Sequence, residues 1–395
     1  MRIGIDIRTL MDVRYSGVAE YVLHLLHAIF KLEQENQQDQ QQAEQTESNQ
    51  YYLFYNSAKN LSQTMPKFDY PNVQMIGRRY PNKLLNYALL KLLNWPKTNQ
   101  LFQQELDFFL MPHLNFVALE SKTKNILTIH DLSFLRYPKF FSWRQNVWHS
   151  IINVKKLVRK FDTIVAISEN TKQDLIELCN VPEEKIKVIL SAIDDEYQVI
   201  EKTDARLMEV KNKLNLPDRF ILHLGTVEPR KNIEGLIVGY NDFRENHPDA
   251  DDVKLVIAGG RGWKSEKIYQ AIKNSKYQAD IILTGYIEDQ DKVALYNLAE
   301  VLAYPSFYEG FGFPPLEAMA CGTPVICSFS SSLPEVVKDS AILIDPYNPT
   351  QISQALEQVL LDKELQRVLI LQGAERAKEF SWKKVAEDYL RMFKI

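Results

Sequence analysis

The sequence predicts an α/β protein of two doubly wound, Rossmann-like domains. Short apolar runs alternate with amphipathic helical segments from end to end, which is typical of parallel sheets covered by helices. The 395 residues exceed the usual size of one domain. A polar stretch near residues 196–216 interrupts the alternation, which then restarts. We therefore expect one domain at residues 1–197 and a second at residues 198–379, facing each other across an interdomain cleft.

The first domain begins with a buried strand pattern at residues 2–7. Apolar residues at i, i+3, i+4 and i+7 then predict a helix over residues 18–29. Residues 31–50 contain eight Gln and five acidic residues. This composition favours a mobile surface insertion over a Gln-rich interaction tract. Further strands are expected at residues 51–55, 126–129, 163–167 and 187–190.

The second domain shows six strand patterns with helical segments between them. They lie at residues 220–225, 254–260, 281–287, 301–306, 324–328 and 341–345. Ligands of doubly wound folds bind outside the carboxyl ends of the strands. The segments that directly follow these strands are therefore the candidate binding loops.

The composition excludes several classes of protein. Hydrophobic residues at 45% and charged residues at 25% exclude a disordered or collagen-like chain. A net charge of −4 argues against a nucleic-acid binder. Three cysteines are too few for a disulfide framework, and neither a secretory signal nor an apolar run of about 18 residues is present. We expect a cytoplasmic protein.

The stretch YEGFGFPPLEAMACGTPV, residues 308–325, carries the most chemistry. It follows the strand at 301–306 and opens a helix with two prolines in the first turn, where a missing N–H costs least. Glu309 lies in the loop, Gly310 and Gly312 allow close approach of a ligand, and Glu317 lies one turn into the helix. The alternative is that the two carboxylates only complement the helix dipole.

EGFGFPPLEAMACGTPVI resembles the signature of family-4 retaining glycosyltransferases of the GT-B fold. The resemblance extends to HDLSFLRYP (130–138), LGTVEPRKN (224–232), SSLPEVV (331–337) and FSW (380–382). It implies that Glu309, with the loop Gly310, Phe311 and Gly312, binds the donor sugar, and that Glu317 binds the nucleotide ribose. It also implies that a last helix, residues 380–395, crosses back to the first domain.

The loop LGTVEPRKN places Arg230 and Lys231 at the carboxyl end of a strand. A diphosphate leaving group needs positive charge there, although adjacent Arg and Lys in a loop are also typical of a solvated pair. The resemblance implies an Arg at the position that Thr226 occupies here. Whether Arg230 supplies that guanidinium stays open.

Two positions of the first domain are further candidates. Gly17, after the candidate N-cap Ser16, opens the first helix, where N–H groups suit a phosphate. His130 and Asp131 follow the apolar run NILTI, although a lone His is more often structural. The resemblance implies that Gly17 contacts the donor phosphates and that His130 is a sugar ligand at the reaction centre. Asp131 and Arg136 are candidates for the acceptor side.

Asp289-Gln290-Asp291 matches the DxD metal motif of another glycosyltransferase fold. It also stands where Asp belongs at the start of a helix, so capping by Asp289 explains it. We therefore predict no bound metal and no cofactor.

The charge is unevenly distributed, because residues 51–160 contain 16 Lys and Arg against 5 Asp and Glu. Within this span, the leucines of residues 83–94 are expected on one helical face. One interpretation is a helix packed on its own sheet with a solvated basic rim. The sharper hypothesis is docking of residues 78–97 and 136–160 on an anionic membrane, at the inner face of the cytoplasmic membrane.

The resemblance implies transfer of a hexose such as mannose from a nucleoside diphosphate sugar to a glycan or lipid-linked acceptor. The resemblance implies a retaining reaction in the synthesis of bacterial surface polysaccharide or glycoconjugates. Gly260 and Tyr286 are candidates for contacts with the base. The alternatives are a sugar-nucleotide epimerase of the same fold and a non-catalytic subunit that binds the sugar nucleotide. A dinucleotide dehydrogenase is disfavoured, because no G-x-G-x-x-G follows the first strand.

Overall fold

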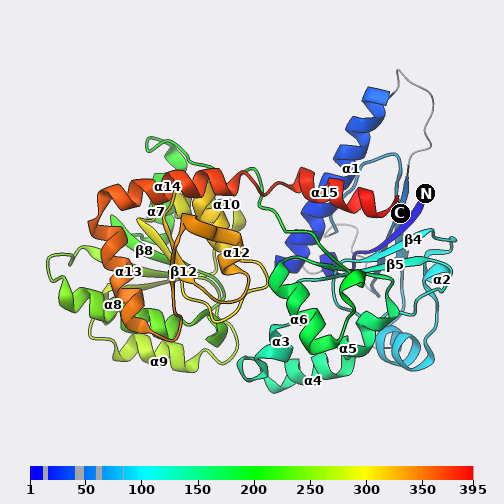
Figure 1. Cartoon of the computed structure of the whole chain (residues 1–395), viewed down its shortest axis with the longest axis horizontal. Coiled ribbons are helices and arrows are strands. Elements are labelled where there is room, and N and C mark those ends of the chain that lie inside the picture. The colour runs from blue at the N-terminus through cyan, green and yellow to red at the C-terminus, as the bar shows by residue number, and fades with distance from the viewer. Residues whose placement is uncertain (12–16, 41–48, 59–64, 83, 395) are drawn as a thin grey trace. The chain divides into compact units, whose positions relative to one another are not determined.

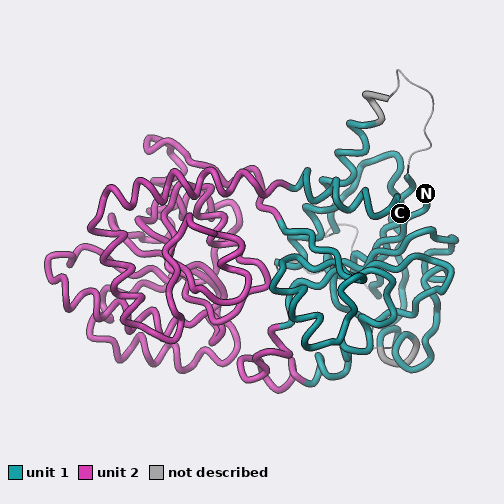
Figure 2. Tube along the Cα trace, in the orientation of Figure 1, with its two compact units in different colours: residues 1–132, 147–191, 382–395 teal, residues 133–146, 192–381 magenta. Residues whose placement is uncertain are grey.

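The chain was analysed as a computed structural model, which describes residues 1–11, 17–40, 49–58, 65–82 and 84–394. Its contacts divide it into two units, drawn in two colours in Figure 2. Unit 1 holds residues 1–132, 147–191 and 382–395, and unit 2 holds residues 133–146 and 192–381. Each unit contains one parallel sheet with helices around it (Figure 1), so the predicted pair of Rossmann-like domains is confirmed.

The sheet of unit 1 has the strand order β3-β2-β1-β4-β5-β6-β7, and all of its pairs are parallel. Its strands are β1 (Arg2–Asp6), β2 (Gln50–Asn56), β3 (Val73–Arg78), β4 (Phe108–Met111), β5 (Lys124–Ile129), β6 (Thr163–Ala166) and β7 (Ile186–Val188). Two of these, β3 and β4, were missed by the sequence analysis. β3 is an edge strand without a fully buried position, so its residues form no apolar run. β4 is the short run FFLM, buried throughout, and its signal was present in the sequence.

The sheet of unit 2 has the order β10-β9-β8-β11-β12-β13, also entirely parallel. Its six strands are β8 (Arg219–Leu224), β9 (Val253–Ala258), β10 (Ile281–Gly285), β11 (Val301–Tyr304), β12 (Val325–Ser328) and β13 (Ile342–Ile344). All six were predicted within a few residues. The order reverses between β8 and β11, which is the switch point where a doubly wound sheet binds ligands.

Helices connect the strands along the whole described chain. They are η1 (Arg8–Met11), α1 (Gly17–Gln40), η2 (Leu84–Leu93), α2 (Thr98–Phe102), α3 (Ser133–Arg136), η3 (Pro138–Phe140), α4 (Trp143–Ile152), α5 (Val154–Leu157), η4 (Val158–Lys160), α6 (Glu169–Cys179), η5 (Glu183–Lys185), α7 (Ala205–Leu214), η6 (Pro229–Lys231), α8 (Ile233–Asn246), α9 (Glu266–Asn274), η7 (Gln278–Asp280), α10 (Asp289–Leu298), α11 (Phe313–Ala320), α12 (Leu333–Val337), η8 (Lys338–Ser340), α13 (Pro349–Leu361), α14 (Lys363–Ala377) and α15 (Trp382–Met392).

The Gln-rich segment differs from the expected insertion. Residues 31–40 continue helix α1, because Gln and Glu are good helix formers. Residues 41–48 lie outside the described residues. Of the predicted mobile segment, the first half is therefore the end of a helix.

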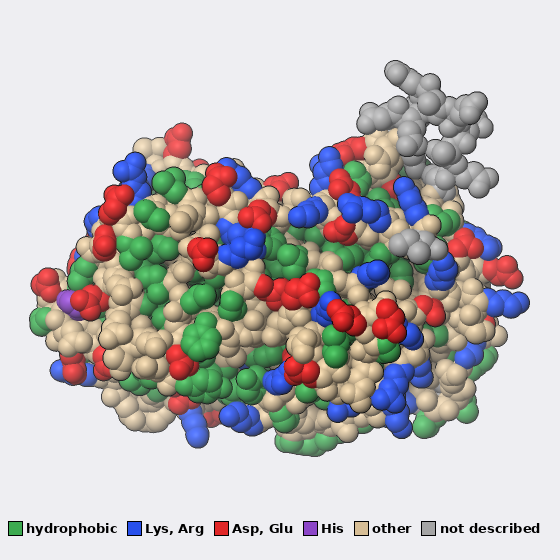
Figure 3. Space-filling view, in the orientation of Figure 1, with side chains coloured by type: hydrophobic (Ala, Val, Ile, Leu, Met, Phe, Trp, Pro, Cys, Tyr) green, Lys and Arg blue, Asp and Glu red, His purple; other side chains and the backbone are tan. Residues whose placement is uncertain are grey.

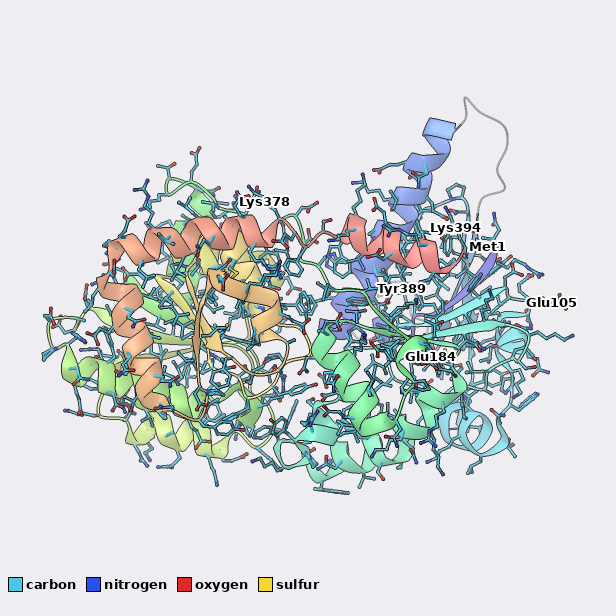
Figure 4. All side chains as sticks on the ribbon, in the orientation of Figure 1. Met1, Glu105, Glu184, Lys378, Tyr389 and Lys394 are labelled. Atoms are coloured by element: carbon cyan, nitrogen blue, oxygen red, sulfur yellow. The ribbon has the colours of Figure 1, made fainter. Side chains whose placement is uncertain are left out.

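The last helix, α15, belongs to unit 1 and packs along α1. The Tyr389 hydroxyl, labelled in Figure 4, lies 2.9 Å from the Tyr21 hydroxyl and 2.8 Å from Thr128 Oγ1. The unit boundaries fall at 191/192 and 381/382, near the expected 197/198 and 379/380. Residues 133–146 are a difference, since we placed them in the first domain and their contacts place them in unit 2.

Leu84, Leu85, Leu92 and Leu93, which were predicted on one helical face, do not share one face. The segment η2 is a π-helix, whose wider winding breaks the 3.6-residue period. Leu85 and Leu90 are buried, whereas Leu84, Leu92 and Leu93 are exposed. Among the described residues, no helix combines the length and the apolar character that crossing a membrane requires.

Candidate active site

A cluster of charged side chains lies in unit 2 where strands β8 and β11 end side by side. Arg230 and Lys231 lie in η6, in the loop that follows β8. Glu309 lies in the loop that follows β11. Parallel pairing brings both loops to the same edge of the sheet, so the structure places these three predicted residues together.

The two cations bind the two oxygens of one carboxylate. Lys231 Nζ lies 2.7 Å from Glu309 Oε1, and Arg230 Nη1 lies 2.7 Å from Glu309 Oε2. Arg230 Nη2 also donates to Glu228 Oε1 at 2.8 Å. The side chains of Lys231, Glu228 and Glu309 are less than a tenth exposed. Two positive and two negative charges thus compensate each other inside the protein, as buried charges must.

Burial and pairing shift the pKa values of this cluster in opposite directions. Burial tends to raise the pKa of Glu309, but Arg230 and Lys231 outweigh it and lower that pKa to about 2. Burial lowers the pKa of Lys231 and raises the pKa of Glu228. Glu309 is therefore a firmly ionised carboxylate, suited to accept hydrogen bonds from sugar hydroxyls.

The loop that carries Glu309 is held by serine side chains of the loop after β12. The Glu309 N–H donates to Ser331 Oγ at 2.8 Å, and Ser332 Oγ donates to the Phe311 carbonyl at 2.6 Å. Gly312 has a φ of +115°, and a Cβ there would lie 2.6 Å from a Leu333 methyl group. The backbone of residues 309–312, Gly310 included, is thus fixed in a conformation that needs glycine at position 312.

Glu317 lies one turn into α11, as predicted, and has its own partner. The Tyr296 hydroxyl donates to Glu317 Oε2 at 2.6 Å. Burial raises the pKa of Tyr296, so it remains a donor. The ribose candidate is thereby oriented by a buried tyrosine that the sequence analysis did not single out.

The remaining candidates of unit 2 follow β8, β9 and β10. A Cβ built on Gly260 would lie 3.9 Å from the Tyr286 side chain, so these two candidates are neighbours. Tyr286 is 51% exposed. Thr226 is exposed in the loop after β8, and Arg230 shares the Glu309 carboxylate with Lys231.

Three residues of the cluster were missed. Glu228 lies in the loop LGTVEPRKN and was not predicted as part of the site. An acidic residue two positions before an Arg is the signal that indicates this ion pair. The Tyr304 ring centroid lies 4.8 Å from Lys231 Nζ, and His223 stacks on that ring at 5.7 Å. Both end apolar strand patterns, where a single polar residue is the available signal.

The capping explanation of Asp289-Gln290-Asp291 needs correction. The N-cap of α10 is Glu288, and Asp289 is its first residue. Asp289 pairs with Lys292 at 2.7 Å, and Asp291 with Lys213 at 2.8 Å. No group of metal-ligating side chains occurs among the described residues, and independence from metal stays a prediction.

Unit 1 carries the other predicted residues. His130 follows β5, where its Nε2 lies 2.8 Å from the Pro112 carbonyl and its ring meets the Tyr21 ring edge-on at 4.7 Å. Because a carbonyl only accepts, Nε2 carries the proton, and burial lowers the pKa of the ring. His130 is thus neutral, with Nδ1 as an acceptor. Gly17 is the first residue of α1, and Ser16 lies outside the described residues.

The two acceptor-side candidates fall in different units. Asp131 follows His130 in unit 1, and Arg136 is the exposed last residue of α3 in unit 2.

A second buried charge cluster in unit 1 was also missed. Arg8 Nε lies 3.0 Å from both carboxylate oxygens of Asp6, and Arg8 Nη2 donates to the Phe116 carbonyl at 2.8 Å. His113 Nε2 lies 3.8 Å from Asp6 Oδ1. Its signal is a charged pair, Asp6 and Arg8, at the end of an apolar strand.

Comparisons with known proteins agree with this geometry. The family "Glycosyl transferases group 1" matches residues 204–376, and "Glycosyltransferase Family 4" matches residues 64–197. O-antigen chain mannosyltransferase B of Escherichia coli is 30% identical over 80% of this chain and 81% of its own length. Serotype-specific mannosyltransferase WbdA of Escherichia coli is 32% identical over 67% of this chain, which spans only 32% of that longer protein.

Solved structures show the same fold at low sequence identity. Sucrose-phosphate synthase of Thermosynechococcus elongatus has a TM-score of 0.73 at 17% identity, over 100% of this chain and 98% of its own. Anabaena HepE, solved in complex with UDP-glucose, has a TM-score of 0.71 at 15% identity, over 100% and 99%. With the fold and both family matches in hand, the chain belongs to the group 1, family 4 glycosyltransferases of the GT-B fold.

Proposed function

We propose that this glycosyltransferase transfers a mannosyl residue from a nucleoside diphosphate sugar to a hydroxyl of a bacterial surface glycan, with retention of the anomeric configuration. The observation that carries the proposal is the pair of cations, Arg230 and Lys231, on Glu309 at the switch point of the sheet. Mannosyl transfer is supported by the two Escherichia coli relatives, both of which are named as mannosyltransferases. HepE supports a nucleotide sugar as the donor.

The charge balance suggests how a donor would use the cluster. Without a donor, Arg230 and Lys231 are neutralised by Glu228 and Glu309. An incoming diphosphate would compete for the two cations, which leaves Glu309 to accept hydrogen bonds from the hexose. The gain is stabilisation of the charge that develops on the departing diphosphate, commonly the largest catalytic effect.

The reaction that fits these groups is a front-face displacement. The bond from the anomeric carbon to the diphosphate oxygen breaks, and the acceptor oxygen bonds to the same face. The departing phosphate oxygen takes the acceptor proton. In this proposal Glu309 accepts hydrogen bonds from hydroxyls of the hexose, so it is not assigned the attack on the anomeric carbon that a covalent intermediate needs. In this proposal Gly17 assists at the phosphates, His130 and Glu317 bind the hexose and the ribose, and neither a metal nor a cofactor takes part.

A panel of nucleoside diphosphate hexoses tests the function. A bound donor stabilises the folded protein by mass action, so the matching donor should raise the melting temperature most. With that donor and a mannose-terminated acceptor, NMR of the product should show the anomeric configuration of the donor. The rate of transfer should be the same with and without EDTA. Donor conversion without an acceptor would instead identify an epimerase. A protein that binds the donor and converts nothing would be the non-catalytic subunit.

An anionic membrane is the partner that the exposed apolar residues of unit 1 favour. Leu92 is 75% exposed and Leu93 is 66% exposed, beside Trp95 and the basic side chain of Lys91. Such a mixture of apolar and basic side chains suits the interface of an anionic bilayer. The other span of the membrane hypothesis, residues 136–160, is divided between the two units, and its Trp143, 70% exposed beside Arg144, belongs to unit 2.

Vesicle flotation tests this partner. The protein should float with vesicles that contain anionic lipid and not with neutral ones. The double variant Leu92→Ser, Leu93→Ser should remain at the bottom, whereas Leu371→Ser, which changes an exposed leucine of unit 2, should float like the parent. Equal flotation of all three proteins would contradict the assignment of this surface.

A further inference from the structure

Aromatic side chains follow three neighbouring strands at one edge of the sheet of unit 2. Phe307 follows β11, Phe329 follows β12 and Tyr347 follows β13. Phe329 is 56% exposed and Tyr347 is 63% exposed. Exposed rings of this size at the ligand-binding end of a sheet need an explanation beyond packing.

Backbone and ring contacts hold the three residues next to one another. The Phe307 and Tyr347 ring centroids are 4.9 Å apart. The Phe329 N–H donates to the Ile344 carbonyl at 2.9 Å, and Ser330 Oγ donates to the Phe307 carbonyl at 3.2 Å. These contacts join the ends of β11, β12 and β13 into one surface.

The turn that carries Tyr347 is fixed from both sides. The Tyr347 N–H donates to Asp345 Oδ1 at 2.9 Å, and Asn232 Nδ2 donates to the Pro346 carbonyl at 2.6 Å. Asn232 directly follows Lys231. The exposed ring is therefore mounted on a turn that the loop of the charged cluster holds in place.

We propose that Phe307, Phe329 and Tyr347 form an aromatic shelf that binds hexose rings of the glycan acceptor. The proposal rests on the proposed function, because it takes a sugar chain to be the acceptor. A hexose presents an apolar face of C–H groups about as large as one aromatic ring, together with hydroxyls at its rim. Phe329 and Tyr347 offer exposed rings, and Phe307, whose ring also stacks on that of Phe140 at 5.5 Å, supports Tyr347. The hydroxyl of Ser330 and the carboxylate of Asp345 lie beside them.

Other occupants fit the surface less well. The carboxylate of Asp345 disfavours phosphate groups and anionic lipid. Three side chains are too few for the area of roughly 1,000 Å² or more that a stable contact between two copies needs. The proposed base contacts, Gly260 and Tyr286, follow β9 and β10 at the opposite edge of the sheet.

The location agrees with the role of an acceptor site. Phe307 is two residues before Glu309, and its N–H donates to the Arg230 carbonyl at 2.9 Å. The sheet order thus places the base candidates at one edge, the charged cluster in the middle and the shelf at the other edge. A glycan on the shelf would end next to the loop that is proposed to hold the donor hexose.

Calorimetric titration of the full chain with linear mannotetraose and with maltotetraose tests the proposal. We expect the parent to bind a tetraose, and the double variant Phe329→Ser, Tyr347→Ser to bind it roughly tenfold more weakly. Phe329→Leu keeps the apolar bulk without the flat ring face and should lose part of the same affinity. Leu371→Ser, an equally exposed change on α14, should bind like the parent.

A nucleoside diphosphate is titrated into every variant, and unchanged affinity shows that the donor half is folded. Parent-like binding of the tetraose by the folded double variant overturns the shelf, as does a parent that binds neither tetraose. Transfer activity is measured separately. Binding through the shelf without any transfer would refute the proposed function and leave the shelf in place.

Discussion

The carboxyl ends of the two sheets both carry buried charges, but the charges are arranged differently. In unit 1, Arg8 donates from Nε and Nη2 to the Asp6 carboxylate. Its Nη1 donates to Asn86 Oδ1 at 3.0 Å. In unit 2, the Glu309 carboxylate is shared by two cations, Arg230 and Lys231. The first arrangement is a closed pair, and the second joins groups from two loops.

The difference separates a structural role from a chemical one. Arg8 pairs with Asp6 at the end of β1 and also donates to Asn86 and to the Phe116 carbonyl. Loss of either charge of this pair would leave the other one buried without a counter-charge. In the proposed function, the diphosphate of the donor replaces Glu309 on the two cations, and hydroxyls of the hexose donate hydrogen bonds to the released carboxylate. On the face drawn in Figure 3, acidic and basic side chains are interspersed, so the buried clusters differ from this surface charge.

Breaking the closed pair should have the largest effect on stability. Arg8→Met leaves Asp6 buried without its cation, so we expect a loss of about 3–5 kcal/mol in the free energy of unfolding, measured in urea. Arg206→Met is the matched control, because Arg206 pairs with Asp204 at the same spacing on the surface. The control should leave the free energy nearly unchanged. Similar losses in both variants would contradict a special role of the buried pair.

Breaking the exchangeable cluster should instead reduce turnover. Lys231→Ala removes one of the two cations proposed to stabilise the departing diphosphate, so we expect kcat to fall about 10²–10³-fold. Lys254→Ala removes a lysine that pairs with Asp280 at 2.6 Å in the same unit and should keep its kcat. Unchanged turnover of folded Lys231→Ala would remove Lys231 from the proposed mechanism.

The buried histidine of unit 1 should make stability depend on pH. Burial lowers the pKa of His113 to about 4, against the attraction of Asp6, from an ordinary value of about 6.5. As the pH falls, His113 is protonated in the unfolded chain before it is protonated in the folded protein. The contribution of neutral His113 to the free energy of unfolding is therefore complete above pH 6.5 and is lost as the pH falls toward 4. His113→Asn should reduce the loss of unfolding free energy between pH 7 and pH 4 by about 3 kcal/mol. Identical losses in urea titrations of parent and variant would refute this.

Much of the architecture was predictable, because parallel strands buried on both faces appear as apolar runs. The six strands of unit 2 are apolar runs, although β10 and β13 are partly exposed. The edge strand β3 is not such a run, whereas β4 is one of only four residues. Glu309, Arg230 and Lys231 were predictable as neighbours because they follow strands that end at one edge. Their partners Glu228, Tyr304 and Tyr296 were not, because which side chain meets which depends on rotamers and loop conformations that periodicity does not encode.

The smallest expected effect concerns one of these missed partners. Tyr296→Phe removes the hydrogen bond of 2.6 Å to Glu317, the carboxylate proposed to bind the ribose. Because this contact orients the donor before the reaction and in the transition state alike, we expect KM for the donor to rise about fivefold with little change in kcat. Tyr240→Phe is the control, since it removes a buried hydrogen bond to the Val253 carbonyl in the same unit. An equal rise of KM in both variants would mean that Tyr296 acts through the fold and not through Glu317. A rise of KM confined to Tyr296→Phe would show that the donor site of unit 2 extends from the charged cluster to helix α11, which carries Glu317.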